Sequence, residues 1–246
     1  MPQIAYLIKE ILLVVTFAVA SYYDIKSRDI PPTIWVPLFA VNTPLTIIDI
    51  FSKPLSLLDL ISIAIDILMT IVYVLMCIAK LIGGADVIAI LAIIATFPTP
   101  RVLVVLLTGH VVLPPILSII TYYVIVLLLF VGINVARNTM SLGLWRKLRI
   151  PLFKLIVYMM IARITTVGEY ISNSKYKFFY PLYVPGMIER LGFDVYEDRD
   201  QWIEKLCQLD RSTPIVVSWG IPMIAVLFIA LTTYILVGDP IQLPIR

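Results

Sequence analysis

Long apolar stretches alternate with short polar connections along this chain of 246 residues. The first stretch runs from about Ile4 to Tyr23, the second from Pro31 to Phe51, and the third from Leu55 to Ala79. Each has about the 20 residues that a helix needs to cross the hydrocarbon core of a bilayer. The pattern therefore predicts three membrane-spanning helices in the first third of the chain.

The stretch from Asp86 to Arg137 is harder to divide. Val87–Phe97 is apolar but has only eleven residues, about 17 Å as a helix. The proline-rich segment Pro98–Arg101 interrupts it, and an apolar pattern resumes at Val102–Leu107 before a stronger span from about Leu113 to Val135. We predict two crossings here, the first of them kinked or shortened by the prolines.

The composition becomes mixed and polar from 138 to 213, and a last apolar span follows from about Ile215 to Val237. We therefore expect an all-α polytopic membrane protein of about six transmembrane helices, with a small cytoplasmic domain between the last two. Residues 1–137 would form the membrane core with helices one to five, 138–213 the cytoplasmic domain, and 214–246 the last helix and tail. Within the domain, the apolar segment Leu152–Ile164 is expected to lie on the membrane surface.

Composition and charge support a membrane protein and exclude several functions. The chain is 61% hydrophobic and 14% charged, whereas about a quarter of the residues of a soluble domain are charged. The net charge of +3 is too small to indicate nucleic acid as a partner. A single histidine, His110, and two distant cysteines give no metal-binding pattern. We expect neither a metal nor a cofactor.

The distribution of Lys and Arg predicts the orientation in the membrane. If Asp24 and Asp86 face the cytoplasm, fifteen of the nineteen basic residues lie on that side, twelve of them between Arg137 and Arg211. Basic residues accumulate in cytoplasmic loops of membrane proteins. We therefore expect the cytoplasmic membrane, with both termini outside.

Asp24 and Asp86 are the candidate catalytic residues, because each stands at the end of a predicted span on the same side of the bilayer. A carboxylate next to hydrocarbon is costly and usually serves a function. Two facing carboxyls share a proton, so one can activate water while the other protonates a carbonyl oxygen. The competing interpretation is that Asp86 caps a helix and Asp24 is a solvated charge. Gly83 and Gly84 are expected to permit a tight turn and close backbone approach.

The residues around both aspartates carry a family resemblance. The segment from Asp24 to Pro31, DIKSRDIP, resembles the D-x-K-x-R-x-I-P motif of type IV prepilin and preflagellin peptidases, the class III signal peptidases. Gly83-Gly84-Ala85-Asp86 resembles the G-x-G-D motif of the same aspartyl membrane proteases. Alanine stands where bacterial members have the second glycine, and archaeal members tolerate a hydrophobic residue there. The similarity therefore points to the archaeal branch.

The resemblance implies a six-helix aspartyl endopeptidase with Asp24 and Asp86 as its catalytic pair. Its partners would be precursors with a short basic leader ahead of an apolar helix, and cleavage would occur at the cytoplasmic face. Lys26 and Arg28 would orient the substrate or stabilise charge, although an anchor role in the membrane is an equal alternative for both. Methyltransferase activity is not expected, because the cysteine-rich segment of bacterial relatives is missing.

Two other functions compete with this one. A presenilin-like intramembrane protease would also use two aspartates, but it needs a Pro-Ala-Leu motif that this sequence lacks. An ion-coupled transporter could use Asp24, Asp66 and Asp86 as relay groups, although no inverted repeat is apparent. For Asp66, in the middle of the third span, we expect a hydrogen-bonded role in helix packing with Ser62 and Thr70.

Overall fold

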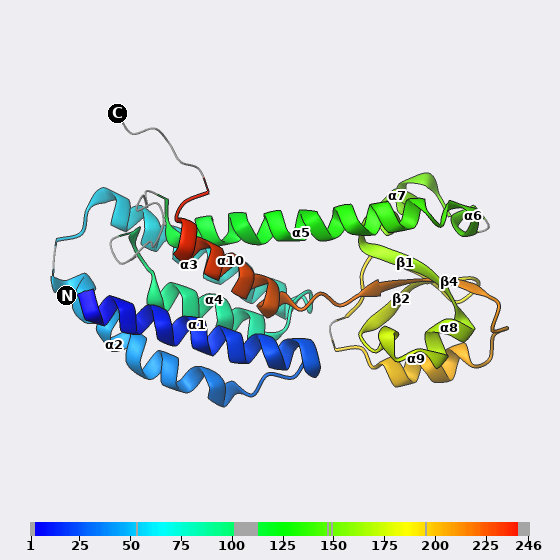
Figure 1. Ribbon diagram of the computed structural model, residues 1–246, viewed down its shortest axis with the longest axis horizontal. Helices are drawn as coiled ribbons and strands as arrows, with labels where there is room; N and C mark the ends of the chain where they lie inside the picture. The colour runs from blue at the N-terminus through cyan, green and yellow to red at the C-terminus, as the bar shows by residue number, and fades with distance from the viewer. Residues whose placement is uncertain are drawn as a thin grey trace. The chain divides into compact units, whose positions relative to one another are not determined.

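A computed structural model of the protein describes residues 3–52, 54–100, 113–146, 148, 150–194 and 196–240. The chain divides into two compact units (Figure 1). One is formed by the residues up to Val126 together with those from Pro222 onward, and the other by Leu127–Ile221. The predicted region 138–213 falls inside the second unit, which begins and ends several residues further out.

The first unit is helical. Its elements are α1 (Gln3–Lys26), the 3-10 helix η1 (Pro32–Trp35), α2 (Val36–Ser52), α3 (Leu57–Ile78), α4 (Gly84–Thr96), the first half of α5 (Pro115–Thr139) and α10 (Met223–Val237). Four helical segments are long and apolar enough to cross a membrane: Ile4–Lys26, Pro32–Ser52, Leu57–Ile78 and Pro115–Thr139. By length and composition the chain is thus a polytopic helical membrane protein, with four candidate spans among the described residues.

Two of the six predicted crossings, the fourth and the last, differ in the structure from what the sequence predicts. Helix α4 has 13 residues, which is about 20 Å and less than the thickness of the hydrocarbon core. The predicted continuation at Val102–Leu107 lies outside the described residues. The last crossing was predicted to begin at Ile215, and this is wrong, because Pro214–Trp219 forms a strand and α10 begins only at Met223.

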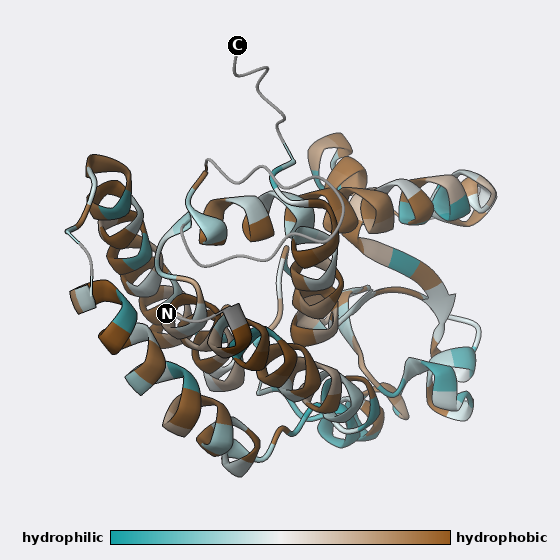
Figure 2. Cartoon of the chain, turned by 60° about the vertical axis from the view of Figure 1, so that its left-hand side comes forward, coloured by the Kyte–Doolittle hydropathy of each residue, from teal (hydrophilic) through white to brown (hydrophobic). Residues whose placement is uncertain are grey.

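Helix α1 is central to the packing of the first unit, where it contacts α2, α4 and α10. The core between these helices contains fully buried side chains such as Leu13, Ile90 and Leu227. Many apolar side chains face outward instead, among them Ile11 on α1 and Leu75 on α3, which are 54% and 59% exposed. Figure 2 shows hydrophobic residues along most of the length of the long helices. Such a surface suits contact with lipid, since burial against protein covers only part of it.

The second unit contains a β-sheet, so the prediction of an all-α chain is wrong for this region. After the second half of α5 come α6 (Leu142–Trp145), α7 (Leu152–Ile161), β1 (Ala162–Thr166), α8 (Val167–Ser172), η3 (Ser174–Tyr176), β2 (Phe179–Val184), β3 (Ile188–Glu189), α9 (Arg199–Leu206) and β4 (Pro214–Trp219). The strands form one antiparallel sheet in the order β1-β4-β2-β3.

Alternation along the central strand β4 explains how the sheet is covered. Ile215 and Val217 belong to one apolar cluster with α8 and α9, whereas Val216 belongs to another with α6 and α7. Successive side chains of a strand point to opposite faces, so helices cover both sides of the sheet. The β-branched residues of this strand, predicted to open a transmembrane helix, are well suited to a buried strand.

The segment Leu152–Ile164 was predicted to lie on the membrane surface. It is helical only as far as Ile161, and β1 follows directly after that residue. Its helical part exposes apolar side chains, with Leu152 and Phe153 about 70% exposed.

Candidate functional site

Asp24 lies in the last turn of α1 and is 7% exposed. Its Oδ2 accepts hydrogen bonds from the backbone amides of Ile224 (2.9 Å) and Ala225 (3.3 Å), at the start of α10. Helix α10 follows Pro222, which offers no side-chain cap. The carboxylate of Asp24 therefore takes that place, and a negative charge at a helix N-terminus is favourable.

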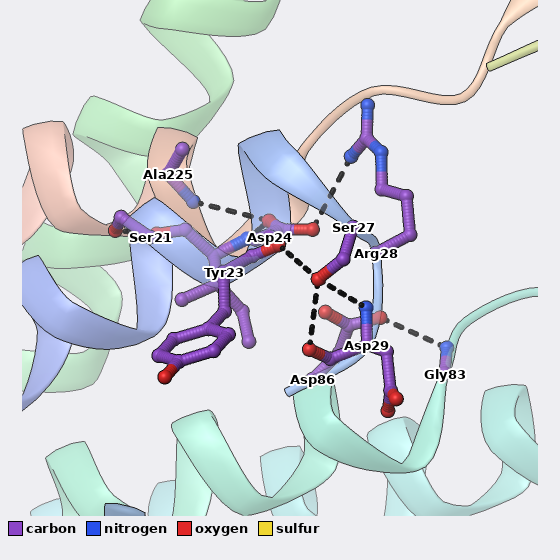
Figure 3. A network of polar contacts seen from close by, with 10 residues as sticks. Ser21, Tyr23, Asp24, Ser27, Arg28, Asp29, Gly83, Asp86 and Ala225 are labelled. Carbon is purple, nitrogen blue, oxygen red and sulfur yellow. Dashed lines mark hydrogen bonds and ion pairs between the residues drawn. The ribbon is translucent and has the colours of Figure 1, made fainter. Parts of the chain in front are cut away.

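The turn after α1 folds Arg28 back onto Asp24 (Figure 3). The backbone amides of Ser27 and Arg28 both donate to the carbonyl of Tyr23, at 2.9 and 3.2 Å. Arg28 has a φ of 61°, a left-handed conformation in which helices commonly end. Its Nη1 then donates to Oδ1 of Asp24 at 3.2 Å, so both carboxylate oxygens of Asp24 have partners.

Asp86 is the third residue of α4 and is half-buried. Its Oδ2 accepts a hydrogen bond from the backbone amide of Gly83 at 2.8 Å, which caps the helix. Asp24 and Arg28 both act on it electrostatically, with opposite sign. The predicted helix-cap role of Asp86 is thus present, and the two predicted carboxyl groups also lie in one polar region of one unit, where α1 and α4 are in contact (Figure 3).

Two tyrosines that the sequence did not single out lie near these carboxyl groups. Tyr73 comes from α3 and is 7% exposed, and it is within electrostatic range of Asp86. Tyr123 comes from α5, and Asp86, Asp24 and Tyr73 all act on it. The sequence carries no local signal for this convergence, because each tyrosine sits in an otherwise apolar span and only the tertiary packing brings it to the aspartates.

The predicted supporting residues differ in their placement. Arg28 belongs to the site, as its bond to Asp24 shows. Lys26 is exposed, and its ammonium group contacts Tyr22 instead, donating to the hydroxyl at 3.1 Å. Among the described residues, no hydrogen bond or ion pair joins Lys26 to either aspartate.

The glycine pair has a different role from the one expected. Gly83 has φ −80° and ψ 159°, a backbone conformation open to any residue, and a Cβ there would sit 3.4 Å from Oδ2 of Asp86. At Gly84 a Cβ would meet nothing within 4 Å. The close backbone approach expected at this pair is therefore not found at either position among the described residues. Gly84, the first residue of α4, leaves open space instead.

Asp66 is buried, at 3% exposure, in the middle of α3. The hydroxyls of Ser62 and Thr70 donate to the backbone carbonyls of Leu58 and Asp66, so they do not bond the Asp66 carboxyl. Neither carboxyl oxygen has a hydrogen-bond partner among the described residues. The predicted hydrogen-bonded packing role with Ser62 and Thr70 is therefore wrong.

A second polar cluster is formed by side chains of α1, α2 and α4. Lys9 is fully buried, and its Nζ donates to Oγ1 of Thr46 at 2.5 Å. Asn42 donates to the backbone carbonyl of Lys9 and to Oγ1 of Thr96, at 3.2 and 2.8 Å. The network ties three helices together and lies within the candidate spans, as polar groups often do in membrane proteins.

Comparison with protein-family models, with curated proteins and with solved structures found no match for this chain. Within the described ranges, no group of three or more His, Cys, Asp or Glu side chains is placed to hold a metal ion. The functional groups described at the site are the two carboxyl groups, the Arg28 guanidinium and the phenols of Tyr73 and Tyr123.

Proposed function

We propose that the protein is a membrane aspartyl endopeptidase that removes short basic leader peptides from pilin-like or archaellin-like precursors at the cytoplasmic face of the cell membrane. Asp24 and Asp86 are its catalytic pair. The observation that carries this proposal is that two carboxyl groups 62 positions apart in the sequence lie in one polar region, where the charge of Asp24 acts on Asp86.

The pair can carry out hydrolysis without a metal. Close carboxyl groups cannot both ionise easily, so one proton is shared between them. The ionised partner takes a proton from water, the water oxygen attacks the scissile carbonyl carbon, and the protonated partner donates to the carbonyl oxygen. The carbon–nitrogen bond of this tetrahedral intermediate then breaks: the partner that took the proton from water donates it to the leaving amine, and the other partner takes back a hydroxyl proton as the carbonyl re-forms. Tyr73 and Tyr123 supply hydroxyl groups that can hold the water or the developing oxyanion. The pair titrates as a unit, so the two roles are not divided between Asp24 and Asp86.

The surroundings suit a substrate with an extended segment ahead of an apolar helix. The open space at Gly84 leaves room for an extended backbone at the start of α4, the helix that carries Asp86. The exposed apolar faces of α1 and α3 offer contact to the hydrophobic helix that follows the leader.

An ion-coupled transporter is the second candidate, and Asp66 favours it. A buried carboxyl without a hydrogen-bond partner inside a candidate span is a typical proton-carrying group.

The deciding experiment is co-expression of the protein with a pilin-like precursor that bears a basic leader. We expect a shift to mature length, abolished by Asp24→Asn and by Asp86→Asn at unchanged expression. Asp29→Asn is the matched control, because Asp29 is exposed, lies in the same turn and undergoes the same loss of charge. Processing that survives either catalytic substitution contradicts the proposal.

Asp66→Asn separates the two candidate functions. The peptidase retains cleavage in this variant. Proton flux into vesicles that is lost in Asp66→Asn, without cleavage by the wild type, would establish the transporter instead.

A further inference from the structure

An apolar cavity of about 470 Å³ lies within the second unit. The second half of α5 forms one wall, and the junction of α7 with β1 and the end of β4 form the others. Trp219 and Phe130 meet edge to face in this wall, with ring centroids 5.9 Å apart. The lining is mostly aliphatic and aromatic, which is typical of sites for ligands with a hydrocarbon part.

Two arginines, Arg137 and Arg163, line the same cavity. Neither guanidinium forms a hydrogen bond or an ion pair within the described part of the chain, and Arg163 instead lies over the ring of Phe179, 5.4 Å from its centroid. Burial and the nearby positive charge of Arg137 lower the pKa of Arg163. Arg137 is exposed and Arg163 is partly buried, so an anion between the two guanidiniums would offset their mutual repulsion.

The cavity wall on α5 changes character along the helix. Leu127, Phe130, Val131, Asn134 and Arg137 follow one another at helical spacing and all line the cavity. The wall is apolar at first and becomes polar over about 15 Å, the rise of ten helical residues. This face belongs to the last part of a candidate membrane span, Pro115–Thr139.

Exposed apolar residues next to the cavity favour a membrane setting. Met160, Ile161 and Ile221 line it and are between 37% and 41% exposed. Helix α7 continues this surface with Phe153 and Ile156, which are 69% and 52% exposed.

We propose that this cavity binds one anionic phospholipid, with the phosphate between Arg137 and Arg163 and an acyl chain along the apolar wall of α5. An anionic lipid carries both a negative charge, which suits the two arginines, and hydrocarbon, which suits the apolar wall. Lipid is also present wherever a candidate span meets the edge of the bilayer. Basic pockets beside membrane helices bind acidic headgroups by the same charge complementarity. The proposal is independent of the catalytic aspartates.

The test is native mass spectrometry of the purified full-length protein in detergent, with phosphatidylglycerol or phosphatidylcholine added. We expect one phosphatidylglycerol to be retained about tenfold more strongly than phosphatidylcholine, because only the former carries a net charge for the two guanidiniums. Equal retention of the two lipids overturns the proposal. So does binding of inorganic phosphate in place of the lipid at similar concentration, which would indicate a site for a free anion.

The variant Arg137→Gln/Arg163→Gln is expected to lose the preference for phosphatidylglycerol. The control Arg146→Gln/Lys177→Gln removes two positive charges from exposed positions of the same unit that do not line the cavity, and it is expected to keep the preference. A preference that persists in the first variant, or disappears in the control, contradicts the proposal. If the first variant does not fold, the comparison of the two lipids on the wild type still decides it.

Discussion

The carboxylate of Asp24 accepts a hydrogen bond from the backbone amide of Ile224, 200 positions later in the sequence, at 2.9 Å. This contact joins the end of α1 to the beginning of α10, the helix pair that packs most extensively in the first unit. Asp24 therefore has a structural role besides the catalytic one proposed for it. Any test of catalysis at this position has to separate the two.

Two substitutions at Asp24 are expected to separate its structural role from its catalytic role, because only the loss of the structural role lowers the stability of the protein. Asp24→Asn keeps an oxygen that accepts from the α10 amides, whereas Asp24→Ala leaves those amides and Arg28 without this acceptor. We expect both variants to lose cleavage, and the alanine variant also to lose about 1–3 kcal/mol of stability. Thermal unfolding in detergent measures the difference. An alanine variant as stable as the wild type would show that the contact contributes little.

Tyr123 is expected to assist the reaction, because it is the phenol on which both aspartates act. Tyr123→Phe should reduce kcat by roughly 10²-fold, as removal of a donor to a developing oxyanion does, with KM nearly unchanged. Tyr122→Phe is the matched control, since the neighbouring hydroxyl donates to the carbonyl of Gly238 instead. Cleavage of a leader-bearing peptide by the purified variants measures both constants. Equal losses of kcat in the two variants would contradict a specific role for Tyr123.

Much of the helical core follows from the sequence, because its spans are long, apolar and separated by polar turns. The predicted spans at Ile4–Tyr23, Leu55–Ala79 and Leu113–Val135 each overlap a long helix whose ends differ by a few residues. The hydrophobic lengths determine these elements almost alone.

Strand β4 shows where this reasoning fails. Pro214–Trp219 is apolar and lies shortly before the apolar helix α10, so a prediction from hydropathy alone extends the helix through it. Its strand conformation depends on pairing with β1 and β2, whose paired residues lie 33 to 56 positions earlier in the sequence. Periodicity cannot distinguish a short buried strand from the first turns of a buried helix.

Only part of the candidate site could be predicted from the sequence, and the reason is similar. Motif spacing singles out Asp24 and Asp86, and it also suggests Arg28, which lies one helical turn after Asp24. The capping of α10 by Asp24 and the approach of Tyr73 and Tyr123 arise from helix packing, which leaves no trace in a local pattern.

Gly84→Ala is expected to stabilise the protein and to slow cleavage. A methyl group meets nothing within 4 Å at this position, and alanine in a helix is favoured over glycine by roughly 0.5–1 kcal/mol. In the proposed function, the substrate backbone passes the open side of Gly84 at the start of α4, so the same methyl group obstructs it. Gly132→Ala, equally free of clashes in α5, should raise the unfolding temperature without affecting cleavage. Unchanged cleavage in Gly84→Ala would show that the substrate does not use this space.

The second unit is expected to lose stability in acid through Glu197. This carboxylate accepts two hydrogen bonds from the guanidinium of Arg190 and one from Nε1 of Trp202 at 2.9 Å. Burial alone would raise the pKa of Glu197, but the hydrogen bonds outweigh it and lower the pKa below its ordinary value of 4.5. A carboxylate whose pKa is lower in the folded state contributes its stability above pH 4.5 and loses it as the pH falls through the folded-state pKa.

Glu197→Gln should therefore cost about 1–3 kcal/mol at pH 7, the usual value of a hydrogen-bonded charged group, and progressively less as the pH falls below about 4.5. Glu204→Gln is the control, because Glu204 is exposed on α9 and the same change in charge should leave stability nearly unaltered. Thermal unfolding followed by tryptophan fluorescence at several pH values measures both variants. A cost for Glu197→Gln that is the same at pH 3 and pH 7 would mean that the ionised carboxylate is not what holds Arg190 and Trp202 together.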